Sequence, residues 1–165
     1  MGWLASARIG WDQVKQAGRL LAACTLAGGG AWLAGLPEGY WAVITAVVVM
    51  QTDLPQTLSA GRDRVVATLA GAAVALVLIA LREQGLPTLP LFVAGLVPLA
   101  LLAAVAPTLR LGCTTLVVVF LIPADGNPYL RPLLRVGDIL FGAAACLAVA
   151  VLTSASRFVT AASDR

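Results

Sequence analysis

The side chains of this sequence that could take part in chemistry are mainly arginine and aspartate. Its 165 residues include no histidine, and Cys24, Cys113 and Cys146 lie far apart inside apolar stretches. Zinc sites, Ser-His-Asp triads and a disulfide framework are therefore excluded or disfavoured, and no cofactor is expected. A net charge of +3 is too small to indicate a nucleic-acid partner. The eight acidic residues also give little material for acid-base catalysis, so we do not expect an enzyme.

Asp138 is the clearest candidate for a functional side chain. It lies inside the otherwise uncharged apolar run 136–152, and Arg135 precedes it by one helical turn on the same face. Ionisable groups at membrane depth face the interior of a helical bundle by default. The pair could bind a substrate. Alternatively, it could be a structural ion pair in which Asp138 complements a helix N-terminus near the interface.

Two pairs of arginines could attract a carboxylate. Arg131 and Arg135 are four residues apart and would share one face of a helix, where two guanidinium groups can bind a carboxylate bidentately. Arg62 and Arg64 could do the same at the other side of the membrane. The competing interpretation of Arg62 and Arg64 is that they only mark a cytoplasmic segment.

The composition indicates what kind of protein must position these residues. Hydrophobic residues make up 60% of the chain and charged residues 12%, against about 45–50% and about 25% in soluble domains. We therefore predict an all-α integral membrane protein, one transmembrane domain over residues 1–165, with the lipid bilayer as its surroundings. Six spans of about 20 residues would fit. The apolar runs are 20–36, 40–50, 65–81, 89–106, 111–123 and 136–152.

The two ends of the chain are expected to lie in the cytoplasm. Residues 1–19 would form an interfacial helix, a signal peptide being the alternative, and residues 153–165 a cytoplasmic tail. With this orientation eight basic residues lie inside and three outside, as the positive-inside rule expects. Tyr40 and Trp41 are assigned to the aromatic belt in preference to ligand stacking. The eight are Arg8, Lys15, Arg19, Arg62, Arg64, Arg110, Arg157 and Arg165, and the three are Arg82, Arg131 and Arg135.

The sequence predicts an internal repeat with one unit at residues 20–81, a second unit at residues 89–152 and a linker at 82–88. A shift of 70 residues aligns Pro37 with Pro107 and Thr45 with Thr115, and a shift of 71 aligns Arg64 with Arg135 and Gly71 with Gly142. Three spans in each unit force the second unit to enter the membrane from the opposite side, which makes a 3+3 inverted repeat.

The second and fifth spans are short, and each ends near a proline, Pro55 or Pro123. Interrupted helices in matching positions of a repeat point to a transport pathway. The alternative is that both prolines merely end their helices near the interface. The pathway would lie beside the polar residues of these spans, which are Thr45, Gln51, Asp53, Thr115 and Asp125.

Small residues recur at intervals of four in the third span and again in the sixth. This spacing lets helix backbones approach closely, so packing or self-association is favoured over substrate contact. The residues are Ala67, Gly71, Ala75 and Gly142.

Residues 40–71, YWAVITAVVVMQTDLPQTLSAGRDRVVATLAG, resemble the signature of the fusaric acid resistance and aromatic acid exporter superfamily. Tyr40, Trp41, Thr45, Arg64, Thr68 and Gly71 match its motif, whereas Ala67 replaces an expected glycine. The resemblance implies a multi-pass protein of the bacterial inner membrane that exports organic anions, commonly aromatic carboxylates. Because one six-span unit is too small to enclose a pathway, a homodimer is expected. The alternative function is a non-transporting subunit or scaffold of a larger efflux complex, and an intramembrane enzyme ranks third.

Overall fold

The computed structural model describes residues 10–36, 38–122 and 127–163, without the side chains of 131 and 155–163. These residues form helices only, so the prediction of an all-helical chain is confirmed for them. The predicted interfacial helix over 1–19 is not a separate element where it is described, because residues 11–19 run without a break into the first apolar run. The helices are α1 (Trp11–Leu33), α2 (Tyr40–Val49), α3 (Leu54–Glu83), α4 (Thr88–Val105), the 3-10 turn η1 (Pro107–Leu109), α5 (Arg110–Leu121) and α6 (Leu130–Ser163).

Local sequence explains where several of these helices begin and end. Asp53 is the extended N-cap of α3, and Pro55 lies in the first turn, where its fixed φ suits a helix start. Pro55 therefore opens α3 rather than interrupting α2. Gly35 (φ 66°) and Gly85 (φ 89°) follow α1 and α3 with a backbone conformation that disfavours other residues. Both glycines thus allow the sharp turns into α2 and α4.

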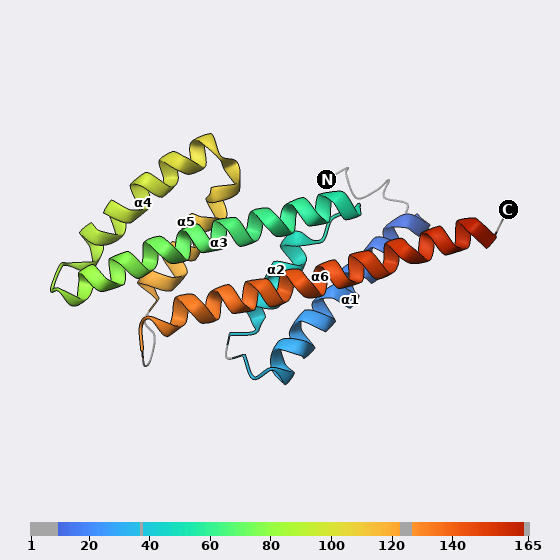
Figure 1. The fold of residues 1–165 in the computed structure, drawn as a ribbon, viewed down its shortest axis with the longest axis horizontal. Helices are drawn as coiled ribbons and strands as arrows, with labels where there is room; N and C mark the ends of the chain where they lie inside the picture. Colours follow the sequence, from blue (N-terminus) through green and yellow to red (C-terminus); the bar gives the residue numbers. More distant parts are fainter. Residues whose placement is uncertain (1–9, 37, 123–126, 164–165) are drawn as a thin grey trace, which may run out of the picture.

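The two longest helices, α3 and α6, run side by side in opposite directions through the middle of the molecule (Figure 1). The short helices cross behind them: α2 packs on α6, and α5 packs on α3. α1 contacts α2 and α6 at one end of the molecule, and α4 contacts α3 and α5 at the other (Figure 1). The apolar core is correspondingly split into one cluster on α1, α2 and α6 and another on α3, α4 and α5.

Three helical segments are long and apolar enough to cross a membrane: Leu54–Glu83, Thr88–Val105 and Pro132–Ser154. Two apolar segments are shorter, Tyr40–Val49 and Pro107–Leu121. At about 1.5 Å per residue, the ten residues of α2 extend only about 15 Å, half of a hydrocarbon core of about 30 Å. Length and composition therefore establish a multi-pass membrane protein.

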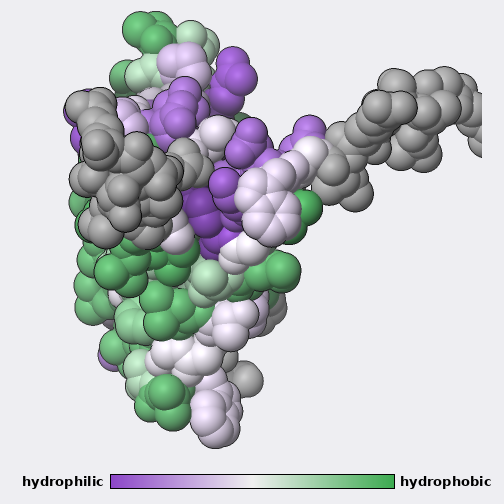
Figure 2. Space-filling view, turned by 90° about the vertical axis from the view of Figure 1, so that its right-hand side faces the viewer, coloured by the Kyte–Doolittle hydropathy of each residue, from purple (hydrophilic) through white to green (hydrophobic). Residues whose placement is uncertain are grey.

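The molecular surface suits lipid. Large apolar side chains are widely exposed, including Val105 (88%) and Trp32 (80%), and these would contact acyl chains. Seen from the end where α1 begins and α6 ends, the surface carries a patch of hydrophilic residues bordered by apolar ones (Figure 2). Asp12, Lys15 and Arg62 are among the exposed charged residues of α1 and α3.

Candidate anion-binding site

Charged side chains are buried where α2, α3 and α6 meet. Arg135 and Asp138 of α6 are 2% and 0% exposed, and Arg64 of α3 is 3% exposed. Arg64 is close enough to Arg135 for the two cations to repel each other, and Asp138 is close enough to attract Arg135. Burying two guanidinium groups together is costly unless anions compensate them. We call Glu38, Trp41, Arg64, Arg135 and Asp138 the central cluster.

Arg135 is held from the N-terminal side of α2. Its Nη1 lies 3.6 Å from Oε2 of Glu38, which is in the turn between α1 and α2. The ring of Trp41 also contacts it, with the centre of the guanidinium group 3.0 Å from the ring centroid. A cation over the face of an indole is attracted by the negative π face of the ring. Trp41 and Glu38 thus both stabilise the position of the guanidinium group.

The cluster contains several buried polar atoms that form no hydrogen bond in the described part of the chain, although one of them, Arg135 Nη1, is within ion-pair distance of Glu38. Arg135 Nε and Nη1, Arg64 Nε, Trp41 Nε1 and both carboxylate oxygens of Asp138 are buried without a hydrogen-bond partner there. Each such atom costs about 1–3 kcal/mol when left unsatisfied. A concentration of unpaired donors beside an unpaired carboxyl group is typical of a site that receives a ligand, water or a proton.

Asp138 does not form an ion pair with Arg135, although the spacing of the two residues allows one. Among the described residues, Arg135 pairs with Glu38, and the oxygens of Asp138 accept no hydrogen bond. The structural ion pair that was one interpretation of the sequence is therefore absent from the observed arrangement. Asp138 stays close enough to interact electrostatically with both Arg135 and Glu38.

The two threonines that the repeat pairs have different surroundings. Both are buried, but Thr115 Oγ1 donates to the Leu111 carbonyl of its own helix at 3.2 Å, whereas Thr45 Oγ1 has no partner in the described structure. Thr45 lies one turn beyond Trp41 on α2. It is thus the threonine with a free hydroxyl, while Thr115 packs against Gly71 of α3.

Gln51 and Asp53 do not join the central cluster. They lie in the α2–α3 turn, where the backbone N–H of Gln51 donates to Thr57 Oγ1 at 3.1 Å and Thr57 Oγ1 donates to the Asp53 carbonyl at 2.9 Å. Arg19 of α1 holds the same turn by donating to the Thr52 carbonyl at 2.8 Å. Backbone groups of Gln51, Thr52 and Asp53 are thus hydrogen-bonded to the side chains of Thr57 and Arg19. The Arg131 side chain, Pro123 and Asp125 lie outside the described residues.

The small residues predicted for helix packing lie at crossings within the chain. A Cβ added to Gly71 would lie 2.3 Å from the Gly112 carbonyl oxygen of α5, and one added to Gly142 would lie 2.3 Å from the Ala42 carbonyl oxygen of α2. Ala67 and Ala75 are fully buried on the same helix as Gly71. These positions bring backbones together, which fixes α2 against the side of α6 that carries Asp138.

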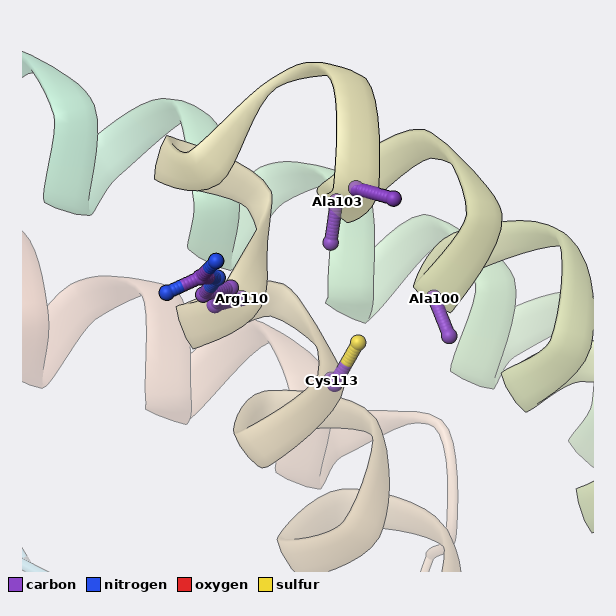
Figure 3. Close-up of a pocket in the computed structure, with 5 residues that line it drawn as sticks. Ala100, Ala103, Arg110 and Cys113 are labelled. Carbon is purple, nitrogen blue, oxygen red and sulfur yellow. The ribbon is translucent and has the colours of Figure 1, made fainter.

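A hollow of about 370 Å³ lies between α4 and α5. In Figure 3 the Cys113 thiol points toward Ala100 and Ala103, whereas the Arg110 guanidinium points away from them. None of the buried unpaired polar atoms recorded for the described residues belongs to its lining. The hollow is therefore apolar, and the central cluster is the better candidate for binding an anion.

Sequence reasoning identified Arg64, Arg135 and Asp138 but did not assign Glu38 or Trp41 to the site. Trp41 was assigned to the aromatic belt, and its contact with Arg135 joins two distant parts of the chain. Tyr40, which is 55% exposed, fits the belt assignment better. The sequence offered only the Tyr-Trp pair at the start of an apolar run. This pattern does not distinguish a tryptophan of the aromatic belt from one that contacts a buried arginine.

Comparison with known proteins identifies the family. The family model described as fusaric acid resistance protein-like matches residues 23–149, so the chain belongs to that family and the resemblance found in the sequence is confirmed. The matched region contains the whole central cluster. No curated protein and no solved structure matches the chain.

Proposed function

We propose that this member of the fusaric acid resistance protein-like family moves small organic carboxylates, aromatic ones among them, across the bacterial inner membrane. Family membership and apolar spanning helices support a membrane transport or efflux role. The observation that carries the substrate class is the burial of Arg64 and Arg135 beside each other with unpaired N–H groups. A carboxylate would satisfy these donors and reduce the repulsion between the two cations.

The chemistry of the site is binding rather than catalysis. The planar guanidinium of Arg135 would meet the carboxylate, and Arg64 would approach it from α3. Trp41 and Thr45 would add a donor each, through Nε1 and Oγ1. The ring of Trp41 offers an aromatic surface next to the cation, which suits a carboxylate attached to an aromatic group. We therefore propose no enzymatic activity.

The contacts of the chain support an inverted repeat. Under the two shifts, Ala42 corresponds to Gly112 and Gly142 corresponds to Gly71, and the crossing of Gly71 with Gly112 has its counterpart in the crossing of Gly142 with Ala42. The helix contacts correspond in the same way, because α2 packs on α6 as α5 packs on α3. Substrate sites of such transporters lie near the midplane, between the repeats. Arg64 and Arg135 correspond under the shift of 71 residues and interact electrostatically, which supports placing the substrate site at this pair.

The arrangement of the turns supports six crossings with the start of α1 and the end of α6 on one side of the membrane, which the distribution of basic residues assigns to the cytoplasm. In Figure 1 the turn that follows α1 lies at the bottom, and the turn that follows α3 lies at the left near the start of α6. The turn that follows α4 lies at the top, and the turn that follows α2 lies beside the start of α3, nearer to the start of α1. Such alternation is expected if the short helices α2 and α5 also cross.

We also propose a homodimer, which would use a surface other than the small-residue stripes. Gly71 and Gly142 are occupied by contacts with α5 and α2, so they are not available to a second copy. The exposed apolar residues of α1 and α4, Trp32 and Val105 among them, lie on the outside of the chain. Cross-linking in native membranes tests this proposal, and a fully active monomer in mild detergent would contradict it.

Flux into liposomes tests the transport proposal. The full chain, reconstituted at defined orientation, should move benzoate faster than protein-free vesicles do, and a panel of aromatic and aliphatic acids should define its preference. Arg64→Gln should reduce the flux strongly, whereas Arg62→Gln, an exposed neighbour on the same helix, should not. Silence with every acid of the panel would favour the alternative, a non-transporting subunit of a larger efflux complex.

A further inference from the structure

The Asp138 carboxyl group is the least satisfied part of the central cluster. It is fully buried, and within the described structure neither of its oxygens has a hydrogen-bond partner. An ionised carboxylate can only accept hydrogen bonds, whereas a protonated one carries its own O–H. Charge without hydrogen-bond partners is very costly in a buried place, so ionised Asp138 depends on the nearby cations, and an anion that occupies those cations favours the neutral acid.

The elements that pack on α6 carry charged groups, of which those nearest to Asp138 come from the turn before α2 and from α6 itself. Glu38, before α2, and Arg135, on α6 itself, act on Asp138 directly. Arg64 of α3 acts on Arg135. Arg19 of α1 lies near Cys146, about two turns further along α6. On α5, Arg110 and Cys113 line the hollow against α4 instead.

The formal charge of the central cluster therefore depends on one proton. With all groups ionised, two guanidinium groups face two carboxylates and the cluster is neutral. With a proton on Asp138 the cluster carries one positive charge. Ionised Asp138 would repel an incoming carboxylate and would partly neutralise the positive charge of Arg135. When Asp138 is protonated, the single positive charge of the cluster would balance the charge of the carboxylate.

We propose that Asp138 carries a proton that binds together with the organic anion, so that the site takes up an anion and a proton jointly and does not exchange one for the other. This inference rests on the proposed transport function. The proton comes from water when the anion binds and returns to water when the anion leaves. A transported monoanion would then move with no net charge, as the equivalent of the neutral acid.

Benzenesulfonate provides the test, because it stays ionised over the whole pH range of the experiment. Any proton taken up when it binds must therefore go to the protein. The purified full chain in detergent is titrated with this probe, and proton uptake is measured with a pH indicator in weak buffer. We expect about one proton per bound anion at high pH, and an affinity that falls by about tenfold per pH unit there.

Matched variants locate the proton. Asp138→Asn keeps the shape of the side chain without a titratable group, so it should bind the probe without proton uptake and with little pH dependence. Asp12→Asn, an exposed position at the start of α1, should behave like the unmodified chain. If Glu38→Gln abolishes the uptake and Asp138→Asn does not, the assignment to Asp138 is wrong.

The failure of this inference can be told apart from that of the proposed function. Binding of benzenesulfonate and benzoate without proton uptake, or with an affinity that rises with pH, would overturn joint binding and leave the anion site intact. No binding of either probe at any pH would overturn the anion site itself. Should Asp138→Asn fail to fold, proton uptake by the unmodified chain still decides whether binding is joint, and uptake that is lost in Glu38→Gln would overturn the assignment to Asp138.

Discussion

At the scale of single residues, Arg135 combines an ion pair with Glu38 and a cation–π contact with Trp41. Arg135→Ala should reduce carboxylate flux by at least about tenfold, because one charge-assisted hydrogen bond contributes about 1.5–3 kcal/mol and about 1.4 kcal/mol corresponds to tenfold. Arg135→Lys should recover only part of the flux, since an ammonium group keeps the charge but loses the planar fork. The measurement is initial flux at matched protein content. Unchanged flux in Arg135→Ala would remove this residue from the mechanism.

The double variant Arg135→Ala with Asp138→Ala separates binding from support of the fold. Arg135→Ala alone leaves Glu38 and Asp138 without their shared cation, so expression should fall as well as flux. Removing Asp138 too should restore expression. If flux returned with it, the role of Arg135 would be structural, whereas folded but inactive protein supports the substrate role.

Trp41 should affect binding through both its ring and its indole N–H. Trp41→Phe keeps an aromatic face over Arg135 and loses the buried Nε1, so benzoate affinity should fall modestly, by less than about tenfold. Trp41→Leu removes the cation–π contact too, worth about 0.5–2 kcal/mol, and should weaken binding further. Trp32→Phe, at an exposed tryptophan of α1, is the control. Equal affinities in all three variants would contradict a role for the indole.

The sequence was sufficient to find the charged half of this site. Asp138 was recognisable because it interrupts an apolar run, and Arg64 and Arg135 because they correspond in the predicted repeat. The partnership of Arg135 was not predictable, since Asp138 is adjacent on the helix whereas Glu38 reaches it only through tertiary packing. Helix periodicity predicts which side chains are neighbours on one helix. It cannot predict whether such a neighbour or a residue from another segment becomes the ion-pair partner.

At the scale of helices, the glycine crossings limit what the fold tolerates. Gly71→Ala and Gly142→Ala should each lower stability by about 1–3 kcal/mol, because the added Cβ meets a backbone carbonyl that cannot rotate away. Gly29→Ala is the matched control, since nothing lies within 4 Å of its added Cβ. Thermal unfolding in detergent measures the difference. Equal stability of Gly71→Ala and Gly29→Ala would contradict the close crossing of α3 and α5.

A hydrogen bond from Tyr129 to Glu83 joins the start of α6 to the end of α3. This bond, with the nearby negative charge, raises the pKa of Tyr129 above its ordinary value of 10.0. The folded state thus keeps a proton that the unfolded state loses first. Its contribution to stability is complete below pH 10 and is lost as the pH rises through the higher, folded-state pKa.

Tyr129→Phe therefore should remove part of the alkaline sensitivity of the chain. The melting temperature of the unmodified chain should fall more steeply above pH 10 than that of the variant, and the two slopes should agree near neutral pH. Parallel curves at alkaline pH would show that this hydrogen bond does not contribute to stability.

The helix order was largely predictable because apolar runs and turn residues mark it. Runs free of charge predicted the positions of the helices, and Gly35 and Gly85 begin the turns as their backbone requires. The start of the chain was less predictable, since the amphipathic stripe of residues 11–19 is the same whether the helix ends there or continues. A proline such as Pro55 can end one helix or begin the next. The observed N-cap at Asp53 shows that Pro55 lies in the first turn of α3.

At the scale of the whole molecule, the topology depends on whether the short helices α2 and α5 cross the membrane. We expect that they do, because the turns before and after α2 lie on opposite sides of the molecule, and so do the turn before α5 and the start of α6 (Figure 1). Single cysteines at exposed positions of these turns, in a chain lacking the three native cysteines, test the expectation. Ala34→Cys, Gln84→Cys and Asn127→Cys should react with an impermeant reagent added outside intact cells. Asp53→Cys and Arg110→Cys should react only after the membrane is opened. If Arg110→Cys and Asn127→Cys reacted from the same side, α5 would not cross, and the inverted repeat would lose its second half.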